Sequence, residues 1–245
     1  MVASFDTHIF WEALSSSPYW KGALLAIELT FVSLATACVL GFFLALGRTS
    51  RFRSVRVFVF FYNWIFRATP TLLQLLFIWN ALPQLWSAFA GSWFKPFLAA
   101  YIGLSLNEAA YMSEIIRAGL LSVDPGQELA GRALGMTRAR ILYRVIVPQA
   151  VRIIIPPTGN EFITLLKLTS LGFVISLHEL LTASQVRASS DFRYVEAYTA
   201  ATVYYLVIVS VLMVLQAQLE RRFTWKSAGR RRRTAPVAAV AHDAR

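Results

Sequence analysis

The chain has 245 residues, of which 57% are hydrophobic and 15% charged, and its formal net charge is +11. This composition excludes an ordinary soluble domain, because so few polar residues cannot cover a globule of this size, and it favours a membrane protein. Nucleic acid is not indicated as a partner, since the basic residues flank long uncharged stretches and have no soluble domain to organise them.

The first part of the chain is predicted to be an interfacial segment followed by a membrane span. Residues 1–21 mix aromatic and acidic side chains with Pro18, which suits a periplasmic position at the headgroups, and no basic stretch indicates a cleaved signal peptide. Residues 22–47 form the first predicted transmembrane helix. Arg48 to Arg56 form a short basic loop, which is retained in the cytoplasm and therefore predicts an outside N-terminus.

Two further spans are predicted before the middle of the chain. The second covers about residues 57–82. Arg67 and Pro70 interrupt it with a charge and a missing amide proton, so this break must face protein or water. The third covers about residues 97–116, with Glu108 in its later half.

The second half of the chain supplies two more spans and a tail. A fourth span lies within residues 145–181, and the uncharged residues 197–219 form a fifth. Residues 221–245 are rich in Arg, Ala and Pro and are predicted to be a basic, disordered cytoplasmic tail. The expectation is an all-α membrane protein of about five transmembrane helices, with its transmembrane domain over residues 22–220 and its C-terminus in the cytoplasm.

Residues 122–148 interrupt the apolar pattern with a polar hairpin. Asp124 can cap a helix whose first position is a proline, and this helix is expected to reach Leu134. Gly135 then supplies the left-handed residue that ends a helix, and Thr137 can cap a second one. A polar, Arg-bearing hairpin between membrane spans predicts a cytoplasmic surface that docks on another protein.

Catalytic and metal chemistry is not indicated. No glycine-rich phosphate loop occurs in the sequence, so the chain itself is not expected to bind ATP. The three histidines are scattered, and Cys38 is a single cysteine in an apolar run, which leaves no intramolecular disulfide. We therefore predict neither an enzyme nor a metal site, and no cofactor bound by this chain.

Ionisable residues at membrane depth are the candidates for function, because a charge against lipid is costly. Arg67, which lies beside Thr69 at the break, is interpreted as lining a polar path; the alternative is an internal ion pair with a glutamate. For Glu108 the alternative is an interfacial position where water satisfies it. Glu161 and Lys167 are six residues apart, so they face different sides of a helix and need separate partners.

Short motifs accompany these residues along the chain. They are residues 67–70 (RATP) with Gln74, residues 110–111 (AY) with Glu114 and Arg117, residues 133–136 (ALGM), residues 148–150 (PQA) with Arg152, and residues 167–171 (KLTSL). With them, the sequence resembles the permease subunits of bacterial ABC importers, specifically the polar amino acid family, over roughly residues 20–220.

The family's cytoplasmic signature falls in the hairpin. The ATPase-coupling loop that the resemblance implies consists of Gly126, Gln127, Leu129, Ala130, Gly131, Ala133, Leu134, Gly135, Val145 and Pro148. The chain departs from the family at Leu129, where the signature has a glutamate, and at Gly131, where the signature has its second alanine. Glu128 is displaced from the glutamate position by about 100° around a helix. Either a partner permease supplies the complete motif, or Gly135 and the packing of Leu129 and Leu134 suffice.

The resemblance also implies partners and a substrate class. The hairpin would dock on a cytosolic ABC ATPase dimer that binds the ATP and Mg, a second permease subunit would complete a homodimer or heterodimer, and a periplasmic solute-binding protein would deliver a polar amino acid to the bacterial inner membrane. Two other classes stay open: an ion-coupled secondary transporter and a membrane scaffold without transport.

Under the importer hypothesis, some residues become candidates for the substrate path. They are Arg67, Thr69, Glu108, Asn160, Glu161, Lys167, Thr169 and Ser170. Arg67 is expected to meet a substrate carboxylate, and Glu161 or Glu108 an ammonium group.

Overall fold

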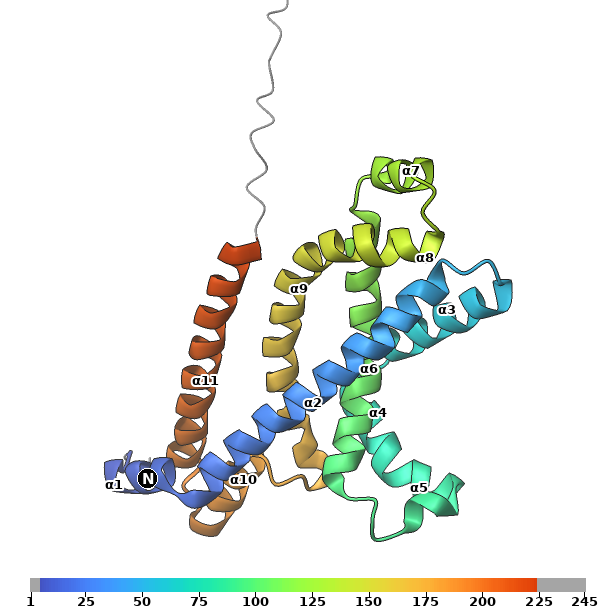
Figure 1. The fold of residues 1–245 in the computed structure, drawn as a ribbon. Helices are drawn as coiled ribbons and strands as arrows, with labels where there is room; N and C mark the ends of the chain where they lie inside the picture. Colours follow the sequence, from blue (N-terminus) through green and yellow to red (C-terminus); the bar gives the residue numbers. More distant parts are fainter. Residues whose placement is uncertain (1–4, 224–245) are drawn as a thin grey trace, which may run out of the picture.

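The computed structural model describes residues 5–223, and this part of the chain contains helices and turns but no strand. Residues 224–245, most of the predicted basic tail, lie outside the described residues, so its predicted disorder stays a prediction. The helices are α1 (Thr7–Ser15), α2 (Ser17–Arg48), α3 (Arg53–Ala68), α4 (Thr71–Leu76), α5 (Leu82–Leu85), α6 (Pro96–Leu121), α7 (Pro125–Ala133), α8 (Arg138–Ile141), α9 (Val147–Leu168), α10 (Leu180–Asp191) and α11 (Tyr194–Phe223) (Figure 1).

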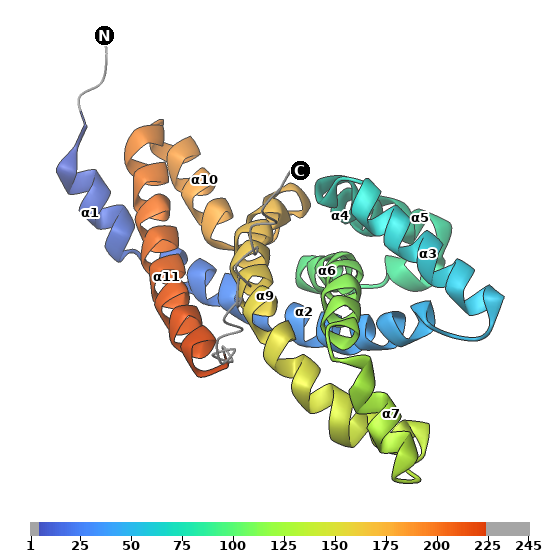
Figure 2. The same cartoon turned by 90° about the horizontal axis from the view of Figure 1, so that it is seen from above.

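α2 and α6 form the centre of the fold. Small residues let the two backbones approach each other: a Cβ added at Gly41 of α2 would lie 2.8 Å from the Cβ of Met112 on α6. Leu29 of α2 and Leu104 of α6 are fully buried in the same apolar cluster. Seen from above, α3 to α5 lie on one side of this centre, and α1, α10 and α11 lie on the other (Figure 2).

The number of spans depends on how bent helices are counted. α2 and α11 are each long and apolar enough to cross a membrane, and up to four spans result if each of two bent helix pairs is one span. The predicted set of about five comprises these four and α6, which lacks the composition of a lipid-facing span. Because neighbouring helices surround α6, it can carry buried polar residues such as Asn107 and Glu108.

The predicted second span is broken where the sequence indicated. α3 ends at Ala68, and Pro70 stands directly before α4. The helices on either side of this break are bent by 104° relative to each other, so the segment is two nearly perpendicular helices rather than one interrupted rod. A π-helical turn, Phe77–Ala81, then leads into the short α5.

α9 is curved because it contains two adjacent prolines. Pro156 and Pro157 lie inside the helix and remove two backbone donors, and α9 changes direction along its length (Figure 1). The Thr158 hydroxyl donates to the carbonyl of Ile154 at 2.8 Å, one turn earlier. The helix then tightens into a 3₁₀ segment, Thr169–Ile175.

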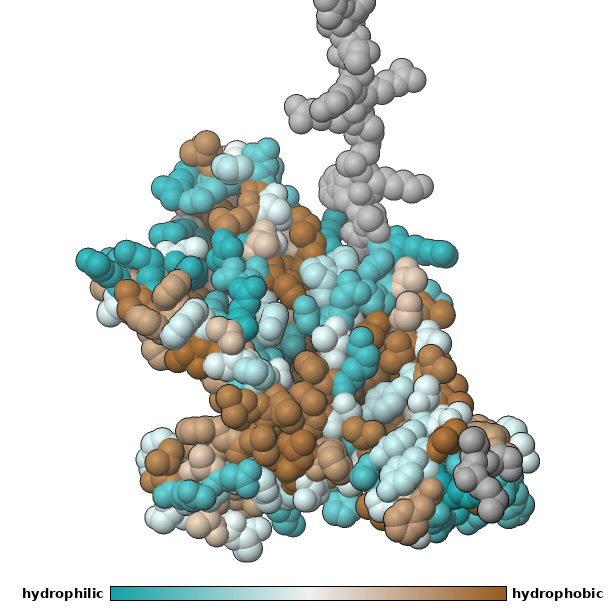
Figure 3. Space-filling model, turned by 180° about the vertical axis from the view of Figure 1, so that it is seen from behind, coloured by the Kyte–Doolittle hydropathy of each residue, from teal (hydrophilic) through white to brown (hydrophobic). Residues whose placement is uncertain are grey.

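The hairpin of α7 and α8 lies at one end of the molecule, together with the last described turn of α11. α1, α5 and α10 lie at the opposite end (Figure 1). Hydrophobic side chains gather over the middle of the surface, and hydrophilic ones gather at the hairpin end (Figure 3). Phe58, Phe60 and Phe61 on α3 are exposed in the described part of the chain, which suits side chains that face lipid.

Candidate functional site

The hairpin is held in shape by hydrogen bonds between residues close in sequence. The Asp124 carboxylate accepts from the amide of Gly126 at 2.7 Å and so caps α7. Gly135 has a φ of 71°, in the left-handed region, and the amide of Met136 donates to the carbonyl of Gly131 at 3.0 Å. The Thr137 hydroxyl accepts from the amide of Arg140 and caps α8. This local geometry confirms the predicted helix, glycine turn and helix.

α7 and α8 pack closely where the family signature has its second alanine. Gly131 is buried, and a Cβ there would lie 2.8 Å from Cγ1 of Ile141, which is 1% exposed. The absence of a Cβ at Gly131 therefore lets α7 and α8 approach each other more closely. This gives the departure at Gly131 a physical reason that the sequence alone did not supply.

The apolar residues of the hairpin point away from the rest of the chain. Leu129 is 67% exposed, Leu134 81% and Tyr143 76%. Most of each leucine side chain is therefore uncovered within residues 5–223 and is available for contact with another protein chain. α7 ends at Ala133 with Leu134 as its cap, one residue earlier than the sequence indicated.

The second helix of the hairpin continues into the membrane region. α8 passes through a π-helical turn, Leu142–Ile146, directly into α9, and Pro148 is tolerated because it lies in the first turn of that helix. The Gln149 amide group donates to the Val145 carbonyl at 2.9 Å and to Oε1 of Gln127 on α7 at 3.4 Å. These contacts connect both arms of the hairpin to α9.

One exposed ion pair lies on α7. Arg132 donates to Oε1 of Glu128 at 2.5 Å, one helical turn away. The hydrogen bond from Arg132 and its positive charge lower the pKa of Glu128. Glu128 thus pairs with a residue of its own helix, and Leu129 occupies the position of the signature glutamate.

Arg67 lines a cavity of about 370 Å³ between α3 and α6. Its guanidinium carbon lies 5.5 Å from the ring centre of Tyr111, a cation–π distance. Glu114, which also lines the cavity, is paired with Arg117 at 2.8 Å. In residues 5–223, no acidic group lies within 4.0 Å of Arg67, but its charge acts on Glu114 across the cavity, so the alternative of an ion pair with a glutamate stays open.

The helix break beside Arg67 is held by two amide side chains. Gln74 of α4 donates to the carbonyl of Phe66 at 3.0 Å and to the hydroxyl of Thr69 at 2.8 Å. Asn107 of α6 donates to the same Phe66 carbonyl and to Oε1 of Gln74, both at 3.0 Å. Thr69 therefore belongs to the hydrogen bonding of the break itself.

These two amides were not among the residues proposed from sequence. Gln74 appeared there only as part of a motif, and Asn107 was not singled out. The sequence does carry a signal that could have identified them. A helix break frees backbone carbonyls that need hydrogen-bond donors, and each of two apolar stretches near the predicted break contains one amide side chain.

Asn160 and Lys167 line a second cavity, of about 420 Å³, between α9 and α11. Gln216 of α11 donates to Oδ1 of Asn160 at 2.8 Å and to Oε1 of Glu220 at 2.9 Å. Gln216 was also missed from sequence, where it lay near the end of an uncharged span. The polar wall of this cavity is therefore shared by two helices.

Thr169 and Ser170 end α9. The Thr169 hydroxyl donates to the Leu166 carbonyl at 2.7 Å, and the Ser170 hydroxyl donates to the Lys167 carbonyl at 2.6 Å. Both hydroxyls are thus used to satisfy the last carbonyls of the helix.

Glu108 is 1% exposed in the middle of α6, so the alternative of a water-satisfied interfacial position is wrong. Its Oε1 has no hydrogen-bond partner among the described residues. Glu161 on α9 lies within electrostatic range of it. Glu179, which precedes α10, is likewise fully buried and caps that helix by accepting from the amide of Thr182 at 2.7 Å.

The substrate-path candidates thus fall into separate places rather than one pocket. Arg67 lies in the cavity beside α3, Asn160 and Lys167 lie between α9 and α11, and Glu108 is buried in α6. The predicted coupling-loop residues, in contrast, follow one another along the hairpin and into the first turn of α9.

The fold and the hairpin define a class: a multi-pass helical membrane protein with a rigid helical hairpin at one end. Residues 37–225 match the family described as "Binding-protein-dependent transport system inner membrane component". The chain belongs to this family. It is the permease component of an ABC transporter and not itself catalytic, and the family does not favour the secondary-transporter and scaffold alternatives.

Several curated proteins are similar to the chain. It is 44% identical over 211 residues to the arginine transport system permease protein ArgU of Corynebacterium glutamicum, covering 82% of this chain and 66% of that relative. It is 39% identical over 215 residues to the probable amino-acid permease protein YxeN of Bacillus subtilis, covering 87% and 95%. It is 34% identical over 218 residues to the glutamine transport system permease protein GlnP of Escherichia coli, covering 89% and 97%.

Solved structures share the fold. A crystal structure of an amino acid ABC transporter with histidines superposes with a TM-score of 0.79 at 35% identity, covering 91% of this chain and all of that one. An inward-facing structure of the MetNI methionine ABC transporter superposes with a TM-score of 0.73 at 20% identity, which shows likeness of fold alone.

Proposed function

We propose that this chain is the permease subunit of an ATP-driven importer that moves a polar amino acid across the bacterial inner membrane. The observation that carries the proposal is the hairpin. It is folded by its own caps, it continues into α9, and it presents two exposed leucines. Relatives named as arginine, glutamine and amino-acid permeases support the substrate class.

In this proposal the hairpin seats on one subunit of a cytosolic ATPase dimer, which binds the ATP and Mg. Burying Leu129 and Leu134 at that contact supplies binding energy at about 1.5–3 kcal/mol per fully buried leucine. Because α8 and α9 are joined by helix without a flexible loop, a displacement of the hairpin passes to α9 as a rigid-body movement.

The proposed orientation follows from charge and from the two ends of the fold. The hairpin end carries Arg48 to Arg56, the arginines of α8 and those at the end of α11, and basic segments are retained in the cytoplasm. The opposite end, with α1, α5 and α10, then faces the periplasm and receives the solute-binding protein. The N-terminus is outside and the C-terminus is in the cytoplasm.

For the substrate path, Arg67 is the proposed contact for the substrate carboxylate. It lines a cavity and makes no salt bridge within 4.0 Å among the described residues, and the neighbouring Glu114 is paired with Arg117. The ammonium group would be met by Glu161 or Glu108 on helices further along the chain. Asn160, Lys167, Thr169 and Ser170 stay candidates for the part of the path beside α9 and α11.

The test is reconstitution in proteoliposomes with a candidate ATPase, a binding protein and, where needed, a second permease. A panel of radiolabelled amino acids identifies the substrate. ATPase activity stimulated by the loaded binding protein, together with uptake that needs ATP, is expected. Uptake that collapses with the proton gradient and needs no ATPase would remove the importer proposal.

Two substitutions examine the finer assignments. Charge reversal at Arg67 (Arg67→Glu) is expected to abolish uptake while the protein still inserts and folds; unchanged uptake removes Arg67 from the path. Leu129→Glu restores the signature glutamate. If uptake rises only when this chain is the sole permease, the partner subunit supplies the complete motif in the natural heterodimer.

A further inference from the structure

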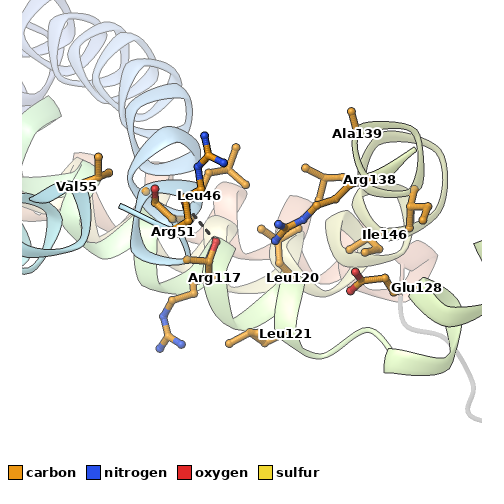
Figure 4. Close-up of a pocket in the computed structure, with 16 residues that line it drawn as sticks. Leu46, Arg51, Val55, Arg117, Leu120, Leu121, Glu128, Arg138, Ala139 and Ile146 are labelled. Atoms are coloured by element: carbon orange, nitrogen blue, oxygen red, sulfur yellow. Dashed lines mark hydrogen bonds between the residues drawn. The ribbon is translucent and has the colours of Figure 1, made fainter. Parts of the chain in front are cut away.

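A cavity of about 700 Å³ lies under the hairpin, separate from the cavity beside Arg67 and the one between α9 and α11. Its walls come from the end of α2, the loop that precedes α3, the end of α6 and the hairpin (Figure 4). It therefore lies at the edge of the membrane region, where two long helices end. Nothing in the transport function described above uses it.

The cavity has an excess of positive charge. Arg51, Arg117 and Arg138 line it, against Glu128 as the one acidic residue among its lining residues. Glu128 is already paired with Arg132, which is not a lining residue.

Two of the three arginines make no salt bridge with a carboxylate in the described part of the chain, and the Arg138 charge acts on Glu128 only at longer range. Arg117 is paired with Glu114. Within residues 5–223, neither Arg51 nor Arg138 has an acidic group within 4.0 Å. The Arg138 side chain reaches from the hairpin toward Leu120 across the cavity (Figure 4).

The rest of the wall is apolar. Val55, Leu120, Ile141, Leu142 and Ile146 line the same space. A small hydrophilic anion would satisfy the arginines but leave this apolar surface uncovered. A ligand that joins a phosphate to an acyl chain covers both.

We propose that this cavity binds the head group of an anionic phospholipid. The phosphate lies against Arg51 and Arg138, and the glycerol and first methylenes lie against Leu120 and Ile146. Basic pockets between transmembrane helices are suited to anionic head groups, and arginine forms strong charge-assisted hydrogen bonds with phosphate. The bound lipid bridges the loop after α2 and the hairpin, and so braces the hairpin against the membrane end of α2.

The test uses the full-length protein in detergent and native mass spectrometry. The probes are a short-chain phosphatidylglycerol, the matching phosphatidylcholine and inorganic phosphate. We expect one tightly held phosphatidylglycerol per chain and weak binding of the other two. Arg51→Gln and Arg138→Gln are each expected to weaken phosphatidylglycerol binding about fivefold, the effect of about 1 kcal/mol per arginine near an anionic lipid.

Matched controls lie on the same two segments. Arg53→Gln, at the first position of α3 and two residues after Arg51, and Arg144→Gln, in the hairpin with Arg138, remove the same charge from residues that do not line the cavity. Both should bind phosphatidylglycerol like the unmodified protein. Arg138→Lys keeps the charge, and it should retain most of the affinity if the arginine contact is electrostatic.

Three results would overturn the proposal. An equal loss in all four glutamine variants would mean general attraction to a basic surface. Equal binding of phosphatidylcholine would remove the need for a negative head group. Displacement of phosphatidylglycerol by inorganic phosphate at similar concentrations would identify the ligand as free phosphate rather than lipid.

Discussion

The hairpin and the helix break after α3 face the same physical problem and use different partners. Both leave backbone groups without helical hydrogen bonds. In the hairpin, Asp124 and Thr137 supply caps to amides two or three residues away. At the break, Asn107 reaches the carbonyl of Phe66 across 41 residues of chain. The hairpin is therefore held by contacts within its own segment, whereas the break is held in part by α6, which packs beside it.

The largest expected effect is at the break, where the comparison predicts a loss of global stability. Gln74→Leu removes the donor to the carbonyl of Phe66 and to Thr69, and it leaves the Asn107 amide with one acceptor fewer. A buried polar group without a partner costs about 1–3 kcal/mol, so a destabilisation of at least about 2 kcal/mol is expected. Thermal unfolding in detergent measures it.

Asn80→Leu is the matched control. Asn80 lies a few residues further along, is exposed, and donates to the Leu76 carbonyl four residues earlier. It should change stability by less than about 0.5 kcal/mol. Equal Tm losses in the two variants would show that the long-range hydrogen bonds do not hold the break.

At the hairpin we expect the opposite result, in which binding to the ATPase is weakened while the fold of the permease keeps its stability. Leu134 is 81% exposed, so Leu134→Asp should leave thermal unfolding unchanged. If the leucine is buried by the ATPase, losing about 1.5–3 kcal/mol of burial weakens that contact by roughly 10- to 150-fold. Co-purification and titration with the ATPase measure it, and an unchanged affinity would remove Leu134 from the interface.

The same contrast explains which parts of the molecule the sequence could predict. The hairpin was predictable because its signals, Asp124, Gly135 and Thr137, act on neighbouring residues. The break at Pro70 was predictable for the same reason. The partners Gln74 and Asn107 were not, since their contact is made only when α4 and α6 pack together.

The substrate path shows the limit of reasoning from depth alone. Arg67, Glu108 and Lys167 stand out in the sequence because each is an ionisable residue within an apolar stretch. Their charge and polarity could not indicate that Arg67 and Lys167 line different cavities, or that Glu108 is buried in α6. That distribution depends on how the 104° bend after α3 and the curvature of α9 place these helices against their neighbours, which the local sequence does not indicate.

The third prediction tests whether the backbone of the turn, rather than space around it, sets the hairpin geometry. Gly135 has a φ of 71°, and an added Cβ would meet nothing within 4 Å. Gly135→Val should therefore cost about 1–2 kcal/mol through backbone strain alone, and it should lower amino acid uptake per ATP hydrolysed. Gly135→Asn, which tolerates this conformation, should keep most of the uptake. Intact uptake with valine would mean that the turn has no coupling role.

The smallest effect is expected on α7, where Arg132 holds the pKa of Glu128 below its ordinary value. A lowered pKa means that folding favours the ionised carboxylate. This contribution is present at neutral pH and is lost as the pH falls through the lowered pKa. Arg132→Gln should reduce hydrogen-exchange protection of the α7 amides slightly at neutral pH and make it less sensitive to acid, after correction for intrinsic exchange. Arg144→Gln, outside this pair, should leave both unchanged. Because the pair lies within one helix, unfolding of the break and of α6 should not respond, and a global shift would contradict the local character of the hairpin.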